Sequence, residues 1–139
     1  MFWQQKAYWV NLNLHKLKTK KMTTQEVANR LVELCRQGKI EETLHELFAA
    51  NAISTEANAS MGPQVVEGLT AIIGKSKMFQ SMVEEFHGAK ISDPLIAGNY
   101  FSISWSLDVT MKGQSRMLME EICVYKVDEG KIVSEQFFY

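Results

Sequence analysis

The stretch from Phe101 to Met111 alternates between apolar and polar side chains, with a large apolar residue at every odd position. This two-residue period places the apolar side chains on one face of a strand and the polar ones on the other. Turn residues follow at 112–114 and 128–130, and each turn leads into another strand-like stretch. The last forty residues therefore predict a three-stranded antiparallel meander with one buried face.

The segment that opens at Thr23 has helical periodicity. Thr23 and Glu26 are spaced as a capping box, in which the hydroxyl and the carboxylate each accept a hydrogen bond from a free backbone N–H group. Apolar residues then recur at helical spacing up to Gly38, which suits the left-handed position just past a helix end. We therefore predict a helix over 24–37 and a second, shorter one over 40–48.

Two more elements are predicted between these helices and the meander. Residues 52–57 indicate a short strand, and an apolar stripe indicates a third helix over 67–86. His87 would then end this helix, where the helix dipole favours a cation. Pro94 marks a break or an edge in the strand that begins near Ala89, because proline has no N–H group to donate to a ladder. The predicted fold is α+β, with three helices packed on a curved sheet.

The length and composition fit one domain. A chain of 139 residues is too short for two separate cores, and its 46% hydrophobic and 22% charged residues are typical of globular proteins. Residues 1–22 are expected to be a basic leader or extension outside the core, and residues 23–139 to be the domain. We expect the native protein to begin at Met22, directly before the predicted capping box.

The net charge of −1 combines a basic leader with an acidic domain. Residues 1–21 carry five lysines and no acid, which leaves 10 basic and 16 acidic side chains for the rest of the chain. This argues against nucleic acid as the partner, since phosphate binding needs a clustered basic face. No apolar run reaches the roughly 18 residues of a membrane span, and the leader lacks the residue order of a secretory signal. Cys35 and Cys123 predict buried thiols in a reducing compartment, the cytoplasm.

Four short motifs occur in a fixed order within residues 23–139. They are Gly38-Lys39, Leu47-Phe48-Ala49-Ala50-Asn51-Ala52, Glu67-Gly68-Leu69-Thr70-Ala71-Ile72 and Gly130-Lys131-Ile132-Val133. Together with the order of the predicted elements, they resemble the SnoaL-like group of the ketosteroid-isomerase-like, nuclear-transport-factor-two-like superfamily. The resemblance implies a cone-shaped, cystatin-like barrel with a curved mixed or antiparallel sheet. It also implies a deep pocket between the helices and the concave sheet face, commonly in a homodimer.

The resemblance implies a first candidate site residue. The isomerase-type base is an aspartate shortly after the Ala-Asn-Ala-like run, and Glu56 takes this place if the second helix carries one inserted residue. Its small neighbours Ser54, Thr55 and Ala57 leave room for a ligand; a solvated glutamate at a strand edge is the alternative. The oxyanion-binding tyrosine of the first helix would fall near Leu31, so that hydrogen-bond donor is missing.

A second candidate follows from the register of the meander. If the first turn is centred on Gly113, Trp105 pairs with Glu121 and Ile103 with Cys123. Glu121 then stands on an apolar wall, where desolvation raises the pKa of a carboxyl and prepares it as a general acid or base. A structural pair with Arg116, Lys126 or a backbone donor is the alternative. The predicted pocket-lining residues are Leu31, Phe79, Phe101, Ile103, Trp105, Met119, Cys123, Tyr125 and Phe137.

The last strand carries the third candidate. A three-residue loop with Gly130 in the left-handed region turns Glu135, Phe137 and Tyr139 toward the pocket. A two-residue loop would turn their even-numbered neighbours there instead. We favour the three-residue loop, which makes Glu135 a pocket acid; a solvated or dimer-facing carboxylate is the alternative.

Glu56, Glu121 and Glu135 are therefore the predicted catalytic residues of a cofactor-free isomerase, cyclase or hydrolase that acts on a small apolar molecule. A non-catalytic ligand-binding module is the competing hypothesis. A dimerisation scaffold is the third, in which large residues such as Trp105 and Phe79 fill the cavity. The sequence has no metal-ligand spacing and no glycine-rich phosphate or dinucleotide loop, so we expect neither a metal nor a cofactor.

Overall fold

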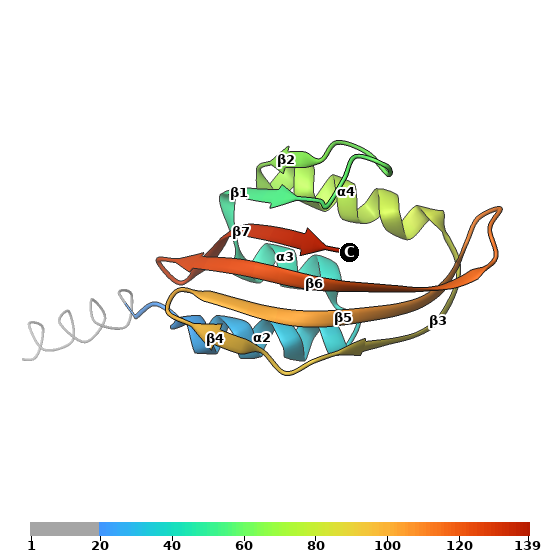
Figure 1. Cartoon of the computed structure of the whole chain (residues 1–139). Coiled ribbons are helices and arrows are strands. Elements are labelled where there is room, and N and C mark those ends of the chain that lie inside the picture. The colour runs from blue at the N-terminus through green and yellow to red at the C-terminus, as the bar shows by residue number, and fades with distance from the viewer. Residues whose placement is uncertain (1–19) are drawn as a thin grey trace, which may run out of the picture.

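The computed structural model of the protein describes residues 20–139 (Figure 1). The predicted leader, residues 1–22, lies almost wholly outside the described residues. In the described part, no helix is long and apolar enough to cross a membrane. The elements are α2 (Thr24–Arg36), α3 (Ile40–Leu47), β1 (Phe48–Thr55), β2 (Val65–Glu67), α4 (Leu69–Met82), β3 (Val83–Ile91), β4 (Leu95–Ala97), β5 (Tyr100–Met111), β6 (Arg116–Asp128) and β7 (Lys131–Phe138).

The strands form one mixed sheet in the order β2-β1-β7-β6-β5-β3, and β4 pairs with part of β5. Strands β1 and β7 run parallel, whereas the other neighbours are antiparallel. The predicted meander is confirmed, with Trp105 opposite Glu121 and Ile103 opposite Cys123. Helix α2 lies along β4 and β5, and α4 lies along β1 and β2 (Figure 1). The predicted α+β fold of three helices on a curved sheet is thus confirmed.

Helix α2 begins as predicted, with a complete capping box. The Thr23 hydroxyl accepts a hydrogen bond from the Glu26 N–H group at 3.2 Å, and the Glu26 carboxylate accepts one from the Thr23 N–H group at 3.1 Å. At the other end, Gly38 has a φ of 73°, which a residue with a Cβ atom rarely adopts. Local sequence signals therefore define both ends of α2.

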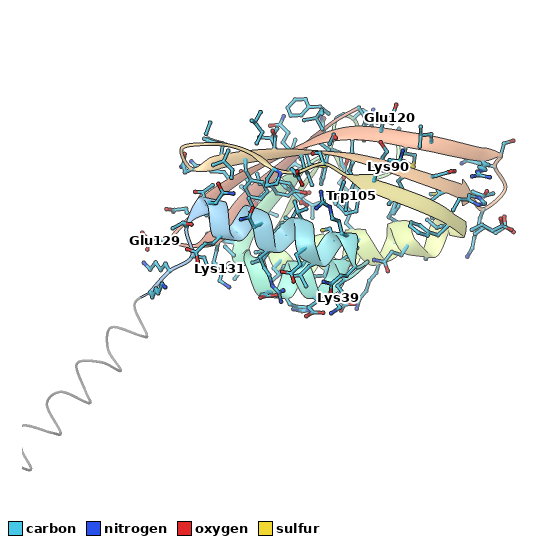
Figure 2. The ribbon with its side chains drawn as sticks, turned by 90° about the horizontal axis from the view of Figure 1, so that it is seen from below. Lys39, Lys90, Trp105, Glu120, Glu129 and Lys131 are labelled. Atoms are coloured by element: carbon cyan, nitrogen blue, oxygen red, sulfur yellow. The ribbon has the colours of Figure 1, made fainter. Side chains whose placement is uncertain are left out.

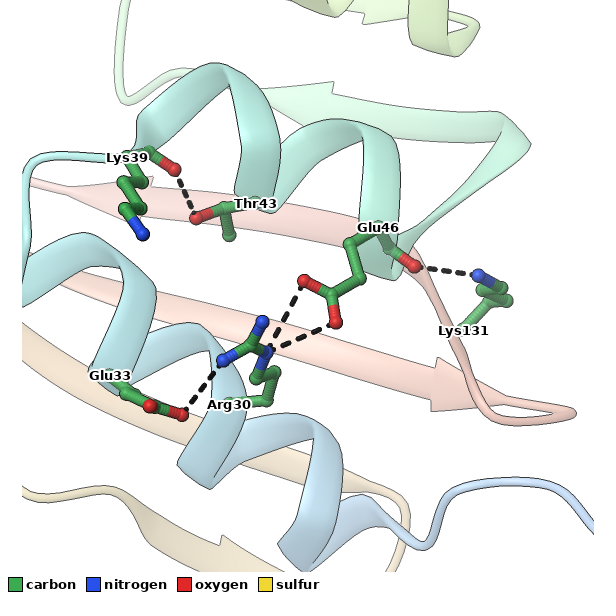
Figure 3. Close-up of polar contacts among 6 residues, drawn as sticks. All are labelled: Arg30, Glu33, Lys39, Thr43, Glu46 and Lys131. Atoms are coloured by element: carbon green, nitrogen blue, oxygen red, sulfur yellow. Dashed lines mark hydrogen bonds and ion pairs between the residues drawn. The ribbon is translucent and has the colours of Figure 1, made fainter.

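Polar contacts join α2 to α3, and α3 to the start of β7 (Figure 3). The Arg30 guanidinium donates to the carboxylates of Glu33 and Glu46, each at 3.0 Å. The Lys131 ammonium donates to the backbone oxygen of Glu46 at 2.6 Å. These contacts hold the start of β7 close to the helix that leads into its parallel neighbour β1.

The apolar core lies between α2 and the sheet. The Phe101 and Tyr125 rings stack within it, with centroids 4.7 Å apart. The side chains that α2 buries are Val27, Ala28, Leu31, Val32, Leu34 and Cys35. Sheet residues of the same core include Phe101, Ile103, Cys123, Tyr125 and Ile132. The odd-numbered apolar positions of the predicted meander therefore supply the floor of this core.

The third helix is shorter than predicted. Helix α4 ends at Met82, and residues 83–91 form β3, which pairs along β5. A long neighbouring strand offers these residues a ladder of backbone hydrogen bonds, and this tertiary pairing outweighs the local helical pattern. Phe86 is consequently 65% exposed on β3. His87 contacts the Thr110 hydroxyl at 2.8 Å, so its predicted position at a helix end is wrong.

The turn between β6 and β7 also differs from the prediction. It contains two residues, Glu129 and Gly130, both at positive φ (51° and 76°), so the predicted three-residue loop is wrong. The register then shifts by one residue just before Lys126, as in a β-bulge. Beyond this shift Glu135 lies opposite Tyr125 and faces the interior. The bulge therefore turns Glu135 to the interior, which is the orientation that the three-residue loop was expected to produce.

Candidate functional site

The three candidate glutamates come from separate parts of the sheet and surround one lysine. Glu56 directly follows β1, which spans Phe48–Thr55 rather than the predicted 52–57, while Glu121 lies in β6 and Glu135 in β7. Lys75, from the middle of α4, forms an ion pair with Glu56. Burial raises the pKa of Glu121 and Glu135, and the Lys75 charge opposes this rise in both. The structure therefore brings the three predicted acids into one electrostatic cluster.

Hydrogen bonds link two of these acids through Ser54 and Lys75. The Ser54 hydroxyl donates to Glu135 Oε1 at 2.7 Å. Lys75 Nζ donates to Ser54 Oγ at 2.6 Å and to Glu56 Oε1 at 2.7 Å. The Tyr139 hydroxyl donates to the second oxygen of Glu56 at 3.3 Å. The parallel register of β1 and β7, which sets Ser54 opposite Glu135, creates the inner end of this chain.

Glu135 is the most buried acid of the cluster, with 6% of the residue exposed. Burial raises its pKa to about 7; the Ser54 hydrogen bond and the Lys75 charge lower it, and the charges of Glu56 and Glu121 raise it further. Desolvation outweighs the favourable hydrogen bond because the carboxylate has little water around it. Glu135 therefore gains and loses a proton near neutral pH.

Glu121 is the second perturbed acid. Burial raises its pKa, and a hydrogen bond from the Cys123 thiol, at 3.5 Å from Oε1, opposes this effect. The proposed alternative of a pair with Arg116 is wrong, because Arg116 donates to both oxygens of Asp108 at 2.9 and 2.7 Å. Glu121 is thus a partly desolvated carboxyl on the helix-facing side of the sheet.

Trp105 lies directly opposite Glu121, on the same face of the sheet. Figure 2 shows it between α2 and the strands, where it packs beside the core. Within residues 20–139 its indole Nε1 is buried and has no hydrogen-bond partner. A buried donor that lacks an acceptor costs about 1–3 kcal/mol. This N–H group is therefore a place where an acceptor atom of a ligand would be stabilised.

Aromatic residues of the last strand border the cluster. Lys75 Nζ lies 5.0 Å from the ring centroid of Phe137, which is within the range of a cation–π contact. Partial burial and the Glu56 charge raise the pKa of Tyr139. Among the residues that the structure describes, no three His, Cys, Asp or Glu side chains are grouped as metal ligands. The cluster offers acids, one cation and aromatic surface.

The residues predicted to line a pocket fall into two groups. Five of them belong to the packed core below α2: Leu31, Phe101, Ile103, Cys123 and Tyr125. The others are partly exposed: Phe79, Trp105, Met119 and Phe137. Trp105 lies opposite Glu121, and Phe137 lies under Lys75, so the second group contains the residues next to the acids.

Sequence reasoning missed the two residues that connect the acids. Lys75 interrupts the apolar stripe of α4 between Ile72 and Phe79, and a cation at such a position was the available signal. Ser54 is fully buried in β1, two residues after the equally buried Ala52, so it occupies an inward position. Its neighbour across the ladder, Glu135, is not adjacent in sequence, and only the parallel β1–β7 register reveals the pair.

A separate groove of about 400 Å³ lies on the surface beside α2, and none of the three candidate glutamates lines it. Val32 and Pro94 contribute to its lining. Arg36 and Asp93 border it and already pair with each other at 2.9 Å. Among the described residues, this groove has no buried side-chain donor that lacks a partner, whereas the glutamate cluster lies beside the indole N–H group of Trp105. We therefore assign the candidate site to the glutamate cluster.

The arrangement of helices on a curved sheet, with acids facing the helices, defines a small α+β protein of the cystatin-like class. The family model of the SnoaL-like domain matches residues 22–139, and the chain belongs to this family. No curated protein sequence matches the chain.

Solved structures support this assignment. A proposed SnoaL-like polyketide cyclase from Mesorhizobium loti is 34% identical, with a TM-score of 0.79 over 85% of this chain and 100% of that one. A protein of cystatin-like fold from Xanthomonas campestris is 16% identical, with a TM-score of 0.71 over 84% of this chain and 90% of that one. A ketosteroid isomerase-like protein from Catenulispora acidiphila is 20% identical, with a TM-score of 0.66 over 84% and 87%. The last two show the fold alone.

Proposed function

We propose that this protein is a cofactor-free enzyme of the SnoaL type, an isomerase, cyclase or hydrolase that acts on a small apolar molecule. In this proposal Glu135 takes a proton from the substrate and returns it. One observation carries the proposal: Glu135 is buried, is held by the Ser54 hydroxyl at 2.7 Å, and has its pKa raised to about 7. A catalytic acid or base works best when its pKa lies near the working pH.

A second carboxyl supports this chemistry. Glu121 faces the same side of the sheet as Glu135, and burial raises its pKa as well. Two acids in different environments can divide the roles of acid and base. Glu56 is bound by Lys75 and Tyr139 at the more exposed end of the cluster, so we assign it an electrostatic rather than a direct role.

The surroundings favour an apolar ring compound that carries an acceptor oxygen, such as a carbonyl. Phe137 and Trp105 provide aromatic surface, and the buried indole N–H of Trp105 would donate to the oxygen. The relationship to the proposed polyketide cyclase from Mesorhizobium loti, at 34% identity, supports a substrate of this kind.

The proposal is tested by carboxyl carbon-13 NMR over pH 4 to 10. The Glu135 signal is assigned by its loss in Glu135→Gln, and the exposed Glu42 of α3 serves as a matched control through Glu42→Gln. We expect Glu135 to titrate near pH 7 and the Glu135→Gln variant to lose turnover of any substrate found. A Glu135 midpoint near the ordinary value of 4.5 would refute the proposal.

Native mass spectrometry distinguishes catalysis from simple binding. A compound that co-purifies with the protein and is returned unchanged after incubation would favour a non-catalytic binding module. A compound that is converted by the wild type, and bound but not converted by Glu135→Gln, would favour the enzyme. The second outcome is the one we expect, because the amide keeps the shape of the side chain without its titratable proton.

We also propose that two copies of the chain pair through the sheet face that points away from the helices. Apolar side chains are exposed there on adjacent strands: Ile53, Leu118, Ile122 and Phe138. Ile122 lies opposite Phe138 on one side and the uncharged Ser104 of β5 on the other. Burial of such a surface favours association.

Light scattering after size-exclusion chromatography tests the pairing. We expect a dimer for the wild type and a monomer for Ile122→Asp, because a charge at the centre of this face would be desolvated in the dimer. Met78→Asp is the matched control, since Met78 is exposed on α4. A wild-type monomer, or a dimer that persists in Ile122→Asp, would contradict this assignment.

A further inference from the structure

We propose that Ser54 and Lys75 form a proton path between buried Glu135 and the more exposed Glu56, which lets Glu135 exchange its proton while a ligand covers the site. The inference rests on the proposed role of Glu135 as acid and base. It goes beyond that role because it assigns a function to two residues that need not touch the substrate.

The geometry of the path is continuous. Glu135 Oε1 to Ser54 Oγ is 2.7 Å, Ser54 Oγ to Lys75 Nζ is 2.6 Å, and Lys75 Nζ to Glu56 Oε1 is 2.7 Å. The two distances to carboxylate oxygens fall within the usual hydrogen-bond range, and the Ser54–Lys75 distance is slightly shorter than that range. The inner members of the path are buried, with 6% of Glu135 and 0% of Ser54 exposed, whereas 25% of the side chain is exposed in both Lys75 and Glu56. The path thus leads from the interior to water.

A proton can move along these hydrogen bonds and leave Ser54, Lys75 and Glu56 in their original protonation states. When the Glu135 carboxylate takes the hydroxyl proton of Ser54, Ser54 Oγ takes a proton from the Lys75 ammonium. Glu56 then passes a proton from a solvent hydronium ion to Lys75. One proton has moved from solvent to Glu135, every intermediate group has regained its own, and the reverse sequence returns the proton to solvent.

The Ser54–Lys75 contact also resembles the serine–lysine pair of some hydrolases, in which the lysine activates the hydroxyl as a nucleophile. Two observations argue against that role here. Ser54 is fully buried, so an electrophilic substrate carbon has no approach to Oγ. Its hydroxyl proton already points to Glu135. The contact therefore serves proton transfer better than nucleophilic attack.

Several charged or titratable groups surround Glu135 and enter the test. Lys75 acts from α4, Glu56 from the end of β1 and Glu121 from β6. Tyr125 and Cys123 of β6 and Cys35 of α2 are close enough for the Glu135 charge to raise their pKa. The test variants leave all of these groups except Lys75 unchanged.

The test measures how fast Glu135 exchanges its proton, by carboxyl carbon-13 relaxation dispersion near its titration midpoint in the full-length protein. Lys75→Arg keeps the positive charge but cannot release a proton, since the pKa of arginine exceeds about 12. We expect this variant to slow the exchange by about tenfold or more, because proton transfer through positioned groups is typically worth about 100-fold or more. Lys77→Arg, the same change two residues along α4 and outside the path, should leave the rate unchanged.

A second pair of variants covers the case in which Lys75→Arg disturbs α4. Ser54→Ala removes the middle of the path and should slow the exchange in the same way, while Ser54→Thr keeps a hydroxyl and should restore it. Exchange at the wild-type rate in both Lys75→Arg and Ser54→Ala, with Glu135 still titrating near neutral pH, overturns the proton path and leaves the proposed function standing. An ordinary Glu135 midpoint in the wild type instead overturns the proposed function.

Discussion

Helices α2 and α4 have nearly the same length but meet the sheet in different ways. Helix α2 has 13 residues, a complete capping box and six buried side chains. Helix α4 has 14 residues, no side-chain hydrogen bond at its N-cap, Gly68, and one buried residue, Ile72. Both its capping box and its core packing therefore stabilise α2. Helix α4 has a weaker cap and buries fewer side chains.

The two helices also cover chemically different parts of the sheet. Beneath α2 lie Phe101, Ile103 and Tyr125, which are apolar and tightly packed. Beside α4 lie the Ser54–Lys75–Glu135 hydrogen bonds, which occupy space that a larger apolar core would fill. A buried acid opposes folding once it ionises, so such a cluster needs stability from elsewhere. The comparison indicates that α2 stabilises the fold and that α4 serves the site.

The change with the largest expected effect on stability removes one large apolar side chain from each helix. Leu31→Ala on α2 should lower the free energy of unfolding by about 3 to 5 kcal/mol, because Leu31 is 1% exposed and leaves a cavity. Phe79→Ala on α4 should cost clearly less, since Phe79 is partly exposed. Urea denaturation followed by circular dichroism measures both values. Equal losses would show that α4 contributes as much to the core as α2.

The next prediction concerns the cost of the buried acid. The folded-state pKa of Glu135, about 7, lies above its ordinary value of 4.5, so its protonated form favours the folded state. This contribution is complete below pH 4.5 and is lost as the pH rises through about 7. Glu135→Gln cannot ionise and should be less sensitive to pH.

Between pH 4 and pH 9 the wild type should lose about 3 kcal/mol of stability relative to Glu135→Gln. Each unit of difference between the folded and unfolded pKa values of Glu135 is worth about 1.4 kcal/mol. Chemical denaturation of both proteins at several pH values measures this difference. Glu42→Gln, at an exposed position on α3, controls for the loss of one surface charge. Parallel pH profiles for the wild type and Glu135→Gln would show that Glu135 is not desolvated.

A smaller effect is expected at the start of α2. Thr23→Ala removes the hydroxyl that accepts the Glu26 N–H group and should cost about 1 kcal/mol. Thr70→Ala, at an exposed position in the first turn of α4, is the matched change and should alter stability by less than about 0.5 kcal/mol. Thermal unfolding by calorimetry resolves the two. A loss at Thr70 as large as that at Thr23 would remove the difference between the helix starts.

Most of the fold could be predicted because its signals are local. The capping box at Thr23, the alternation over 101–111 and the turn at Gly113 act within a few residues, and the structure has all three. The errors arose where distant pairing decides the outcome. Residues 83–86 continue a helical stripe, yet they join β5, and the register shift near Lys126 has no signature in the turn sequence.

The site was predicted in part for the same reason. Glu121 followed from the hairpin register, which a single turn sets, and Glu135 followed from alternation along the last strand, although the turn itself was misread. Lys75 reaches the acids from a helix, and Ser54 meets Glu135 across 81 residues of chain. Contacts of this kind depend on the parallel β1–β7 pair, which no local pattern in the sequence specifies.

The smallest predicted effect separates the charge of Lys75 from its place in the hydrogen-bond chain. Lys75→Met keeps an unbranched side chain of similar length on α4 but removes the positive charge that lowers the pKa of Glu135. The Glu135 midpoint should therefore rise, by less than about one pH unit because the Lys75 charge is partly solvated and partly neutralised by Glu56. Lys77→Met, on an exposed turn of the same helix, should leave the midpoint unchanged. Carboxyl NMR titration of the three proteins measures these midpoints, and a fall of the Glu135 midpoint in Lys75→Met would mean that the lysine does not stabilise its carboxylate.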